Sequence, residues 1–304
     1  MNVSKMHDGE IDTDAALIGR LLAAQFPQWA ALPIKSVPSA GTDNALYRLG
    51  DDLVVRLPRI NWAIEQVEKE HQWLPKLRPF LPLAIPISLV KGKPGEGYPW
   101  HWSIYRWLDG ENRPIEHFVD PQQTAIDLAN FIAALQRIDG KDGPLPGPHN
   151  SARGKPLATR DQYTRNAIAN LGNALDADTM TAVWDAAMGA PVWQGPPVWI
   201  HGDLQSGNLL AVQGRLSAVI DFGCLAVGDP AFDVMAAWLF LSAETRGVFR
   251  ATLGVDNAAW TRGRGLALSV GLIALPYYQN SNPILAGIAQ RAIDETLTDY
   301  KKNG

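Results

Sequence analysis

The stretch VWIHGDLQSGNLLAVQGRLSAVIDFG, residues 198–223, decides the fold that we predict for this chain. It contains two short polar clusters separated by an apolar segment that is typical of two short strands turning at Gln213 and Gly214. Asp203 and Asn208, five positions apart, belong to the first cluster, and Asp221 follows Asn208 by thirteen positions in the second. The strand pair would therefore hold three oxygen-bearing side chains in a fixed relation.

This spacing matches the kinase pattern, in which an aspartate is followed five residues later by an asparagine and then by Asp-Phe-Gly. Phosphoryl transfer depends mainly on positioning and on neutralising negative charge. Asp203 is the candidate base for an acceptor hydroxyl, and Asn208 and Asp221 are hard oxygen ligands suited to Mg²⁺. An isolated Asp or Asn in a loop is more often a turn or capping residue. The joint spacing is what favours the functional interpretation.

Residues 201–208 (HGDLQSGN), 220–223 (IDFG) and 228–238 (GDPAFDVMAAW) resemble the aminoglycoside and macrolide phosphotransferase family. The resemblance covers most of the chain. It implies a kinase-like phosphotransferase with Asp203 as base, Asn208 and Asp221 as metal ligands, Mg²⁺, and ATP or GTP as phosphate donor. The His-Gly-Asp form, without an Ala-Pro-Glu element after Asp-Phe-Gly, differs from protein kinases.

The resemblance also implies supporting residues around the candidate base. His201 would orient the loop that carries Asp203, although a catalytic role for His201 is the alternative. Asp229 and Asp233 would cap and brace the loop that holds the site. Cys224 directly follows the Asp-Phe-Gly element, and we interpret it as a small apolar filler rather than a reactive thiol.

The pattern of apolar residues predicts an α+β chain with two lobes, and the resemblance implies that this bilobal fold is protein-kinase-like. A small N-lobe, residues 1–108, would contain an antiparallel sheet and a nucleotide site, and a larger, mostly helical C-lobe, residues 109–304, would contain the catalytic loop and the acceptor site. We expect helices over residues 13–25, 62–77, 122–138, 160–171 and 178–188, and strands over residues 34–38, 45–49, 53–57, 85–90, 102–107 and 198–200. The first three strands suggest a meander. Residues 139–158, rich in Gly and Pro, are either a lid or a solvated connector.

In the N-lobe, the kinase pattern needs a strand cation for the donor phosphates and a helix carboxylate to hold that cation. Arg56 and Glu70 are the candidates. Glu68 is an alternative partner, and Arg56 is alternatively a surface ion-pair residue. Arginine here departs from the usual lysine, and its fork geometry differs from that of an ammonium group.

No Gly-rich kinase loop precedes Arg56 in this chain. We expect Gly41, Thr42 and Asn44 to form a turn whose amides cover the phosphates, or else a plain hairpin turn. The backbone from Tyr105 to Trp107 is expected to contact the nucleotide base.

Composition and charge limit the classes of binding partner that we expect. A net charge of −4 and a pI of about 5.9 provide no basic surplus for a nucleic-acid backbone or an anionic membrane. The apolar runs are too short to span a bilayer, and the N-terminus lacks the apolar core of a secretory signal. A single cysteine fits a reducing compartment. We therefore expect a cytoplasmic protein. The sequence leaves the oligomeric state open.

The acceptor is expected to be a hydroxylated small molecule, most simply an antibiotic that phosphorylation would inactivate. From residue 240 onward, five acidic residues face seven Lys and Arg, so this region has no acidic surplus for a polycationic aminoglycoside. Trp238, Trp260, Tyr277 and Tyr278 are aromatic residues suited either to a larger, less charged ligand such as a macrolide or to core packing. The competing hypotheses are a metabolic small-molecule kinase and a non-catalytic nucleotide-binding protein.

Overall fold

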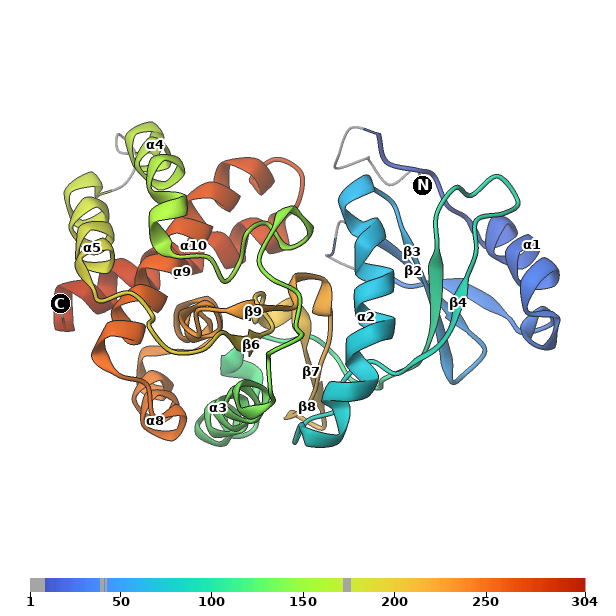
Figure 1. Ribbon diagram of the computed structural model, residues 1–304, viewed down its shortest axis with the longest axis horizontal. Coiled ribbons are helices and arrows are strands. Elements are labelled where there is room, and N and C mark those ends of the chain that lie inside the picture. Colours follow the sequence, from blue (N-terminus) through green and yellow to red (C-terminus); the bar gives the residue numbers. More distant parts are fainter. Residues whose placement is uncertain (1–8, 39–40, 42, 172–175, 304) are drawn as a thin grey trace. The chain divides into compact units, whose positions relative to one another are not determined.

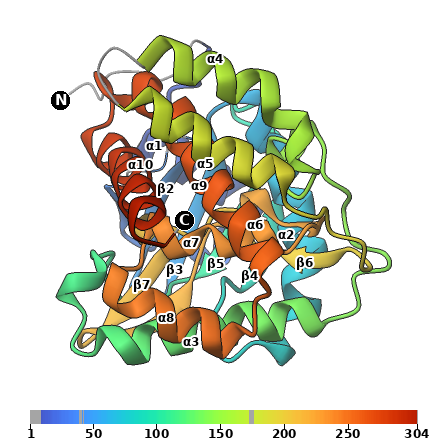
Figure 2. The same cartoon turned by 90° about the vertical axis from the view of Figure 1, so that its left-hand side faces the viewer.

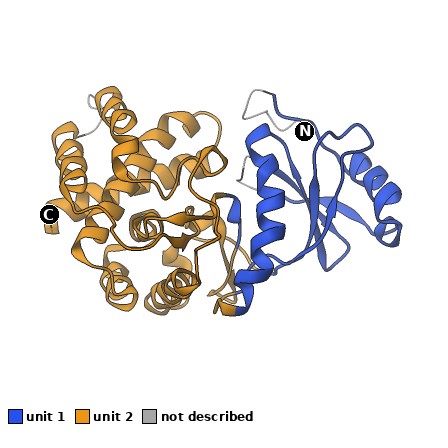
Figure 3. Cartoon of the chain, viewed as in Figure 1, with its two compact units in different colours: residues 1–79, 84–109, 220–223 blue, residues 80–83, 110–219, 224–304 orange. Residues whose placement is uncertain are grey.

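The computed structural model describes residues 9–38, 41, 43–171 and 176–303 of the 304-residue chain. The chain forms two compact units, shown in different colours in Figure 3. Unit 1 contains residues 1–79, 84–109 and 220–223, and unit 2 contains residues 80–83, 110–219 and 224–304. The predicted functional division after residue 108 stays a prediction. The compact units differ from it chiefly because residues 220–223, which include Asp221, belong with the first unit.

Unit 1 is built on a five-stranded antiparallel sheet in the order β1-β2-β3-β5-β4. The first three strands form the predicted meander. The last two do not extend it in sequence order, because β5 pairs with β3 and leaves β4 at the edge. The strands are β1 Ile34–Ser36, β2 Asn44–Leu49, β3 Leu53–Pro58, β4 Ser88–Gly92 and β5 Trp102–Arg106.

The two faces of this sheet are covered by different helices (Figure 1). Helix α1, Ala15–Gln25, begins at Asp14, whose carboxylate accepts the Leu17 N–H at 2.7 Å and so caps the first turn. The apolar side of α1 packs with the inward side chains of β2, β3 and β5 in one buried cluster. Helix α2, Ile64–Leu77, lies on the other face and contributes the polar contacts described below.

Unit 2 is mostly helical around the long helix α9, Asn257–Tyr278, which packs against α10, α5, α6 and α4. Helices α3 and α8 lie side by side, as Figures 1 and 2 both show. The other helices are α3 Pro121–Arg137, α4 Asp161–Leu171, α5 Ala177–Gly189, α6 Ala231–Val234, α7 Ala236–Leu239, α8 Ala243–Leu253 and α10 Pro283–Asn303. No described helix is both long and apolar enough to cross a membrane.

Two small antiparallel strand pairs carry the loops of interest in unit 2. Strands β7, Leu209–Val212, and β8, Arg215–Val219, form the predicted hairpin, and both residues of its turn have positive φ, 50° at Gln213 and 74° at Gly214. Strand β6, Val198–Ile200, pairs with β9, Ala226–Gly228. Strand β9 was not predicted from the sequence.

The long loop of residues 139–158 is attached along its length to this β6-β9 pair. The carbonyl of Pro144 accepts the Val227 N–H at 2.9 Å, and the carbonyl of Gly154 accepts the Asp229 N–H at 3.0 Å. A Cβ atom at Gly228 would lie 2.5 Å from the Gly154 oxygen, so only glycine allows this approach. In this structure the loop packs against β9, and a wholly solvated connector is excluded.

Candidate active site

The candidate catalytic loop follows β6, and the side chain of Asp233 binds its first backbone N–H groups. This side chain is fully buried, and its two carboxylate oxygens accept the N–H groups of His201 and Gly202, each at 2.8 Å. Burial raises the pKa of Asp233, while His201 and the two N–H donors lower it. The ring of His201 is buried as well, and its Nδ1 accepts the Asp203 N–H at 3.2 Å, which places the proton of a neutral ring on Nε2. This geometry supports an orienting role for His201.

Gly202 adopts a left-handed conformation, with φ of 80°. A Cβ atom at this position would approach the Cys224 carbonyl oxygen to 3.0 Å. The sharp bend at Gly202 therefore turns the chain out of β6 and presents the next residue, Asp203, at the surface of unit 2.

Asp203 is oriented through both of its carboxylate oxygens. Its Oδ2 accepts a hydrogen bond from Asn208 Nδ2 at 2.9 Å, and its Oδ1 lies 3.1 Å from Nη2 of Arg153. The same Asn208 amide donates to the Asp203 backbone carbonyl at 2.8 Å. The Asp203 side chain nevertheless stays 30% exposed. Each carboxylate oxygen can accept more than one hydrogen bond, so this group can still receive an acceptor hydroxyl.

Asp229 forms a buried ion pair with Arg262 of α9. Oδ2 lies 2.9 Å from Arg262 Nε and Oδ1 lies 3.0 Å from Nη2, and Oδ1 also accepts the Ala231 N–H at 2.9 Å. Arg262 further donates to the carbonyl of Pro191. Asp229 thus ties the segment after β9 to the helical core, which fits the bracing role predicted for it.

In unit 1, the predicted phosphate-binding cation is the centre of a network on the α2 face of the sheet. The guanidinium of Arg56 lies 2.5 Å from a Glu70 oxygen, 3.1 Å from Gln66 Oε1 and 2.9 Å from Asp221 Oδ1. Only 13% of the Arg56 side chain is exposed, so it is not a surface ion-pair residue. Glu68 instead pairs with Lys91 at 2.6 Å. The carboxylate beside Arg56 is therefore that of Glu70.

The electrostatics of this network keep the arginine charged. Burial lowers the pKa of Arg56, but the carboxylates of Glu70 and Asp221 outweigh that effect and the pKa rises well above its usual value. Glu70 is 1% exposed and accepts a second hydrogen bond from the hydroxyl of Tyr105. The guanidinium is thus preorganised as a fixed positive charge.

Three further residues contact the predicted site residues and were missed by the sequence analysis. Lys69 donates to the Gly223 carbonyl at 2.5 Å, Gln66 contacts Arg56, and Arg153 contacts Asp203. The helical spacing of Gln66, Lys69 and Glu70 on one face of α2 is the signal that would have identified the first two. No local pattern marks Arg153, because its partner is distant in sequence.

Of the three residues predicted to form a turn over the phosphates, Asn44 contacts the Arg56 network. The Asn44 amide lies 3.1 Å from Gln66 Oε1 and 2.9 Å from the Arg56 guanidinium, so it belongs to the same network. Gly41 is exposed, and Thr42 lies outside the described residues.

Near the end of β5, two backbone amides of the expected base-binding segment are already used. The Arg106 N–H donates to Ile87 at 2.9 Å, and the Trp107 N–H donates to Asp52 at 2.7 Å. With these bonds in place, the amides of Arg106 and Trp107 do not take part in the predicted base contact.

The two predicted metal ligands each keep an oxygen available. Asn208 uses its nitrogen on Asp203, and its oxygen accepts no hydrogen bond from the described residues. Asp221 uses Oδ1 for Arg56 and for the Gly223 N–H, while Oδ2 has no such partner among the described residues. The described residues contain no group of three or more His, Cys, Asp or Glu side chains that could hold a metal ion. Each of the two side chains, taken by itself, offers the type of oxygen donor that Mg²⁺ binds.

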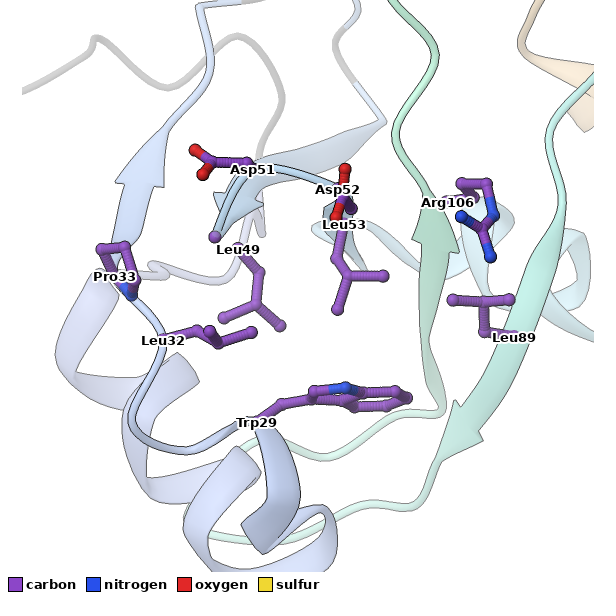
Figure 4. A pocket seen from close by; sticks show the side chains of 10 residues that line it. Trp29, Leu32, Pro33, Leu49, Asp51, Asp52, Leu53, Leu89 and Arg106 are labelled. Atoms are coloured by element: carbon purple, nitrogen blue, oxygen red, sulfur yellow. The ribbon is translucent and has the colours of Figure 1, made fainter.

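A pocket of about 510 Å³ in unit 1 lies on the other face of the sheet (Figure 4). Leu53 and Arg106 line this pocket and lie opposite each other in the β3-β5 register. Arg56 and Tyr105 are an odd number of residues away from them along their strands, so their side chains point to the α2 face. The pocket is thus separate from the Arg56 network.

Comparison with known proteins gives a family match and a fold match. Residues 36–266 match the model of a family described as the phosphotransferase enzyme family. No curated protein sequence matches the chain. Among similar solved structures, a GDP complex of aminoglycoside 2'-phosphotransferase-IIIa has a TM-score of 0.75 and 20% sequence identity, and the match covers 94% of this chain and 99% of that one. A streptomycin-ATP ternary complex of APH(2")-IIa has a TM-score of 0.59 and 17% identity, with 96% of this chain and 97% of that one covered. Macrolide 2'-phosphotransferase MphH from Brachybacterium faecium has a TM-score of 0.61 and 20% identity, with 92% of this chain and 98% of that one covered. At these identities the structural likeness establishes the fold, and it confirms the predicted kinase-like class.

Proposed function

Because this chain belongs to the phosphotransferase enzyme family, we propose that it transfers the γ-phosphoryl group of ATP or GTP to a hydroxyl group of an antibiotic of the aminoglycoside or macrolide type. The observation that carries the proposal is the state of Asp203, which is oriented through both oxygens yet is still partly exposed. A carboxylate held in this way is suited to receive a proton from a bound alcohol.

In the proposed reaction, Asp203 accepts a hydrogen bond from the acceptor hydroxyl. As the bond between that oxygen and the γ-phosphorus forms, the bond between the γ-phosphorus and the β-phosphate oxygen breaks, and the hydroxyl proton passes to Asp203. The products are the phosphorylated acceptor and a nucleoside diphosphate. When bound, Mg²⁺ held by Asn208 and Asp221 would neutralise charge on the phosphates. Arg56, fixed by Glu70, would supply a positive charge to the donor phosphates.

Both nucleotides are proposed as donors because similar proteins are crystallised with each type of base. Aminoglycoside 2'-phosphotransferase-IIIa holds GDP, and the ternary complex with streptomycin holds ATP. The network around Arg56 in this chain offers charge to phosphates and no base-specific group, so it is equally compatible with either donor.

Between the two antibiotic types, the charges of unit 2 favour the macrolide. Arg153 lies beside the candidate base, and Arg160 has no carboxylate within ion-pair distance among the described residues. Burial and the repulsion of Arg153 lower the pKa of Arg160 to about 10. Arg160 is close enough to Arg153 to repel it, and its charge would also repel a polycationic aminoglycoside more than a macrolide, whose charge is small.

The test is a panel of antibiotics and of hydroxylated metabolites, incubated with the purified protein, Mg²⁺ and either ATP or GTP. Mass spectrometry would identify the compound that gains a phosphate, with the Asp203→Asn variant as the inactive control. We expect a macrolide to be phosphorylated and the variant to lose activity about 100-fold or more while it still binds nucleotide. Selective phosphorylation of a metabolite would refute the antibiotic assignment. Nucleotide binding without transfer to any acceptor would refute the enzymatic function.

A further inference from the structure

The loop of residues 139–158 delivers a positive charge to the candidate base, and this contact was not anticipated from any motif. Arg153 approaches Asp203 Oδ1 to 3.1 Å through Nη2, while its Nη1 contacts the Cys224 sulfur. Only 19% of the Arg153 side chain is exposed, so the guanidinium is held between the loop and the catalytic segment. Such an ion pair is partly desolvated, so the attraction between its charges is screened less than at the surface.

The backbone around Arg153 is fixed by a buried asparagine. Asn150 is 2% exposed, and its side chain accepts the Gly147 N–H at 3.0 Å and donates to the Arg153 carbonyl at 2.8 Å and the Cys224 carbonyl at 3.3 Å. One residue after Arg153, Gly154 packs against β9 as described above. The arginine therefore extends from a rigid backbone, which limits the positions that its guanidinium can reach.

We propose that Arg153 is a positioning residue for the phosphoryl transfer reaction, and that it fixes the plane of the Asp203 carboxylate by binding the oxygen that Asn208 does not bind. A carboxylate bound at one oxygen can rotate about its terminal bond, whereas donors on both oxygens restrict that rotation. The orientation matters because the acceptor hydroxyl must meet a carboxylate lone pair and the γ-phosphorus in one geometry. This inference rests on the proposed function of Asp203.

The test compares Arg153→Gln and Arg153→Lys with the wild-type protein. Glutamine removes the charge, whereas lysine keeps a charged donor that can reach the same oxygen. Arg165→Gln is the matched control, because Arg165 also pairs with carboxylates, those of Asp161 and Asp185, but is 43% exposed on the surface of α4. For each protein we would measure kcat, the KM for nucleotide and the thermal unfolding midpoint. Two reactions would be followed, transfer to the antibiotic acceptor and slow nucleotide hydrolysis with water as acceptor.

We expect Arg153→Gln to lower kcat about 10- to 100-fold, as expected for loss of a charged hydrogen bond, with the nucleotide KM changed less than about 3-fold. Arg153→Lys should recover most of that loss, and Arg165→Gln should match the wild type. An unchanged kcat in Arg153→Gln would overturn the inference. A parallel fall in kcat and unfolding midpoint, without recovery in Arg153→Lys, would show a purely structural role and overturn it as well. Absence of both reactions in the wild type would refute the proposed function itself, and the inference with it.

Discussion

The substitution Asp233→Asn tests how the buried carboxylate holds the catalytic loop. Asp233 accepts one backbone N–H on each oxygen, from His201 and from Gly202, each at 2.8 Å. An asparagine has nearly the same shape but only one acceptor oxygen, so its NH₂ group must face a backbone N–H. A donor would then oppose a donor in a fully buried position.

The magnitude follows from these contacts. One backbone N–H and one amide group lose their partners, and each buried unsatisfied group costs about 1–3 kcal/mol, which gives about 2–6 kcal/mol. Part of this is offset because burial raises the pKa of Asp233, which means that the ionised group is itself costly to bury. We therefore expect a net loss of about 2–4 kcal/mol in the free energy of unfolding. Because a shift of about 1 Å in the loop moves Asp203, kcat should also fall about 100-fold.

The assay is guanidinium-induced unfolding followed by fluorescence, together with kcat for the acceptor identified in the panel. Asp256→Asn is the matched control, because Asp256 accepts the Ala259 N–H at 2.7 Å as the N-cap of α9, a role that asparagine fills equally well. That variant should stay within about 0.5 kcal/mol of the wild type. If Asp233→Asn were as stable and as active as Asp256→Asn, the two N–H contacts would not hold the loop.

Three further outcomes are expected. Asp229→Ala should cost about 3–5 kcal/mol in guanidinium unfolding because it leaves the charge of Arg262 buried without its partner, whereas the double variant with Arg262→Met should recover part of the loss. Burial lowers the pKa of His71, so the folded protein binds fewer protons than the unfolded chain and stability should fall as pH drops below about 6.5; urea titrations should show a weaker pH dependence in His71→Gln. Gly228→Ala should cost about 1–3 kcal/mol or more, since its Cβ would overlap the Gly154 backbone, and an unfolding midpoint equal to that of the wild type would contradict this close packing.

The kinase-like fold and the phosphotransferase family were predictable from sequence, and both predictions are confirmed. They depended on short, rigid spacings, such as the one from Asp203 to Asn208, which bring functional groups together within a few residues. Helix and strand bounds were also predictable to within a few residues, because the periodicity of apolar residues reports which face of an element is buried.

Contacts between distant segments were not predictable in the same way. Strand β9 has three residues, too few for a periodic pattern, and only its pairing with β6 defines it. The place of β4 at the sheet edge and the contact of Arg153 with Asp203 depend on the path of the chain. Whether Glu70 or Glu68 pairs with Arg56 depends on which side of α2 meets the sheet, because side chains two residues apart on a helix point in different directions.

The return of residues 220–223 to unit 1 has a consequence for biosynthesis. A nascent chain that has reached residue 109 contains Arg56 and Glu70 but not Asp221, the second carboxylate that contacts the arginine. Domains usually begin to fold from the N-terminus as the ribosome makes them. Here the contact between Arg56 and Asp221 in the amino-terminal unit can form only after most of the helical unit has also been translated.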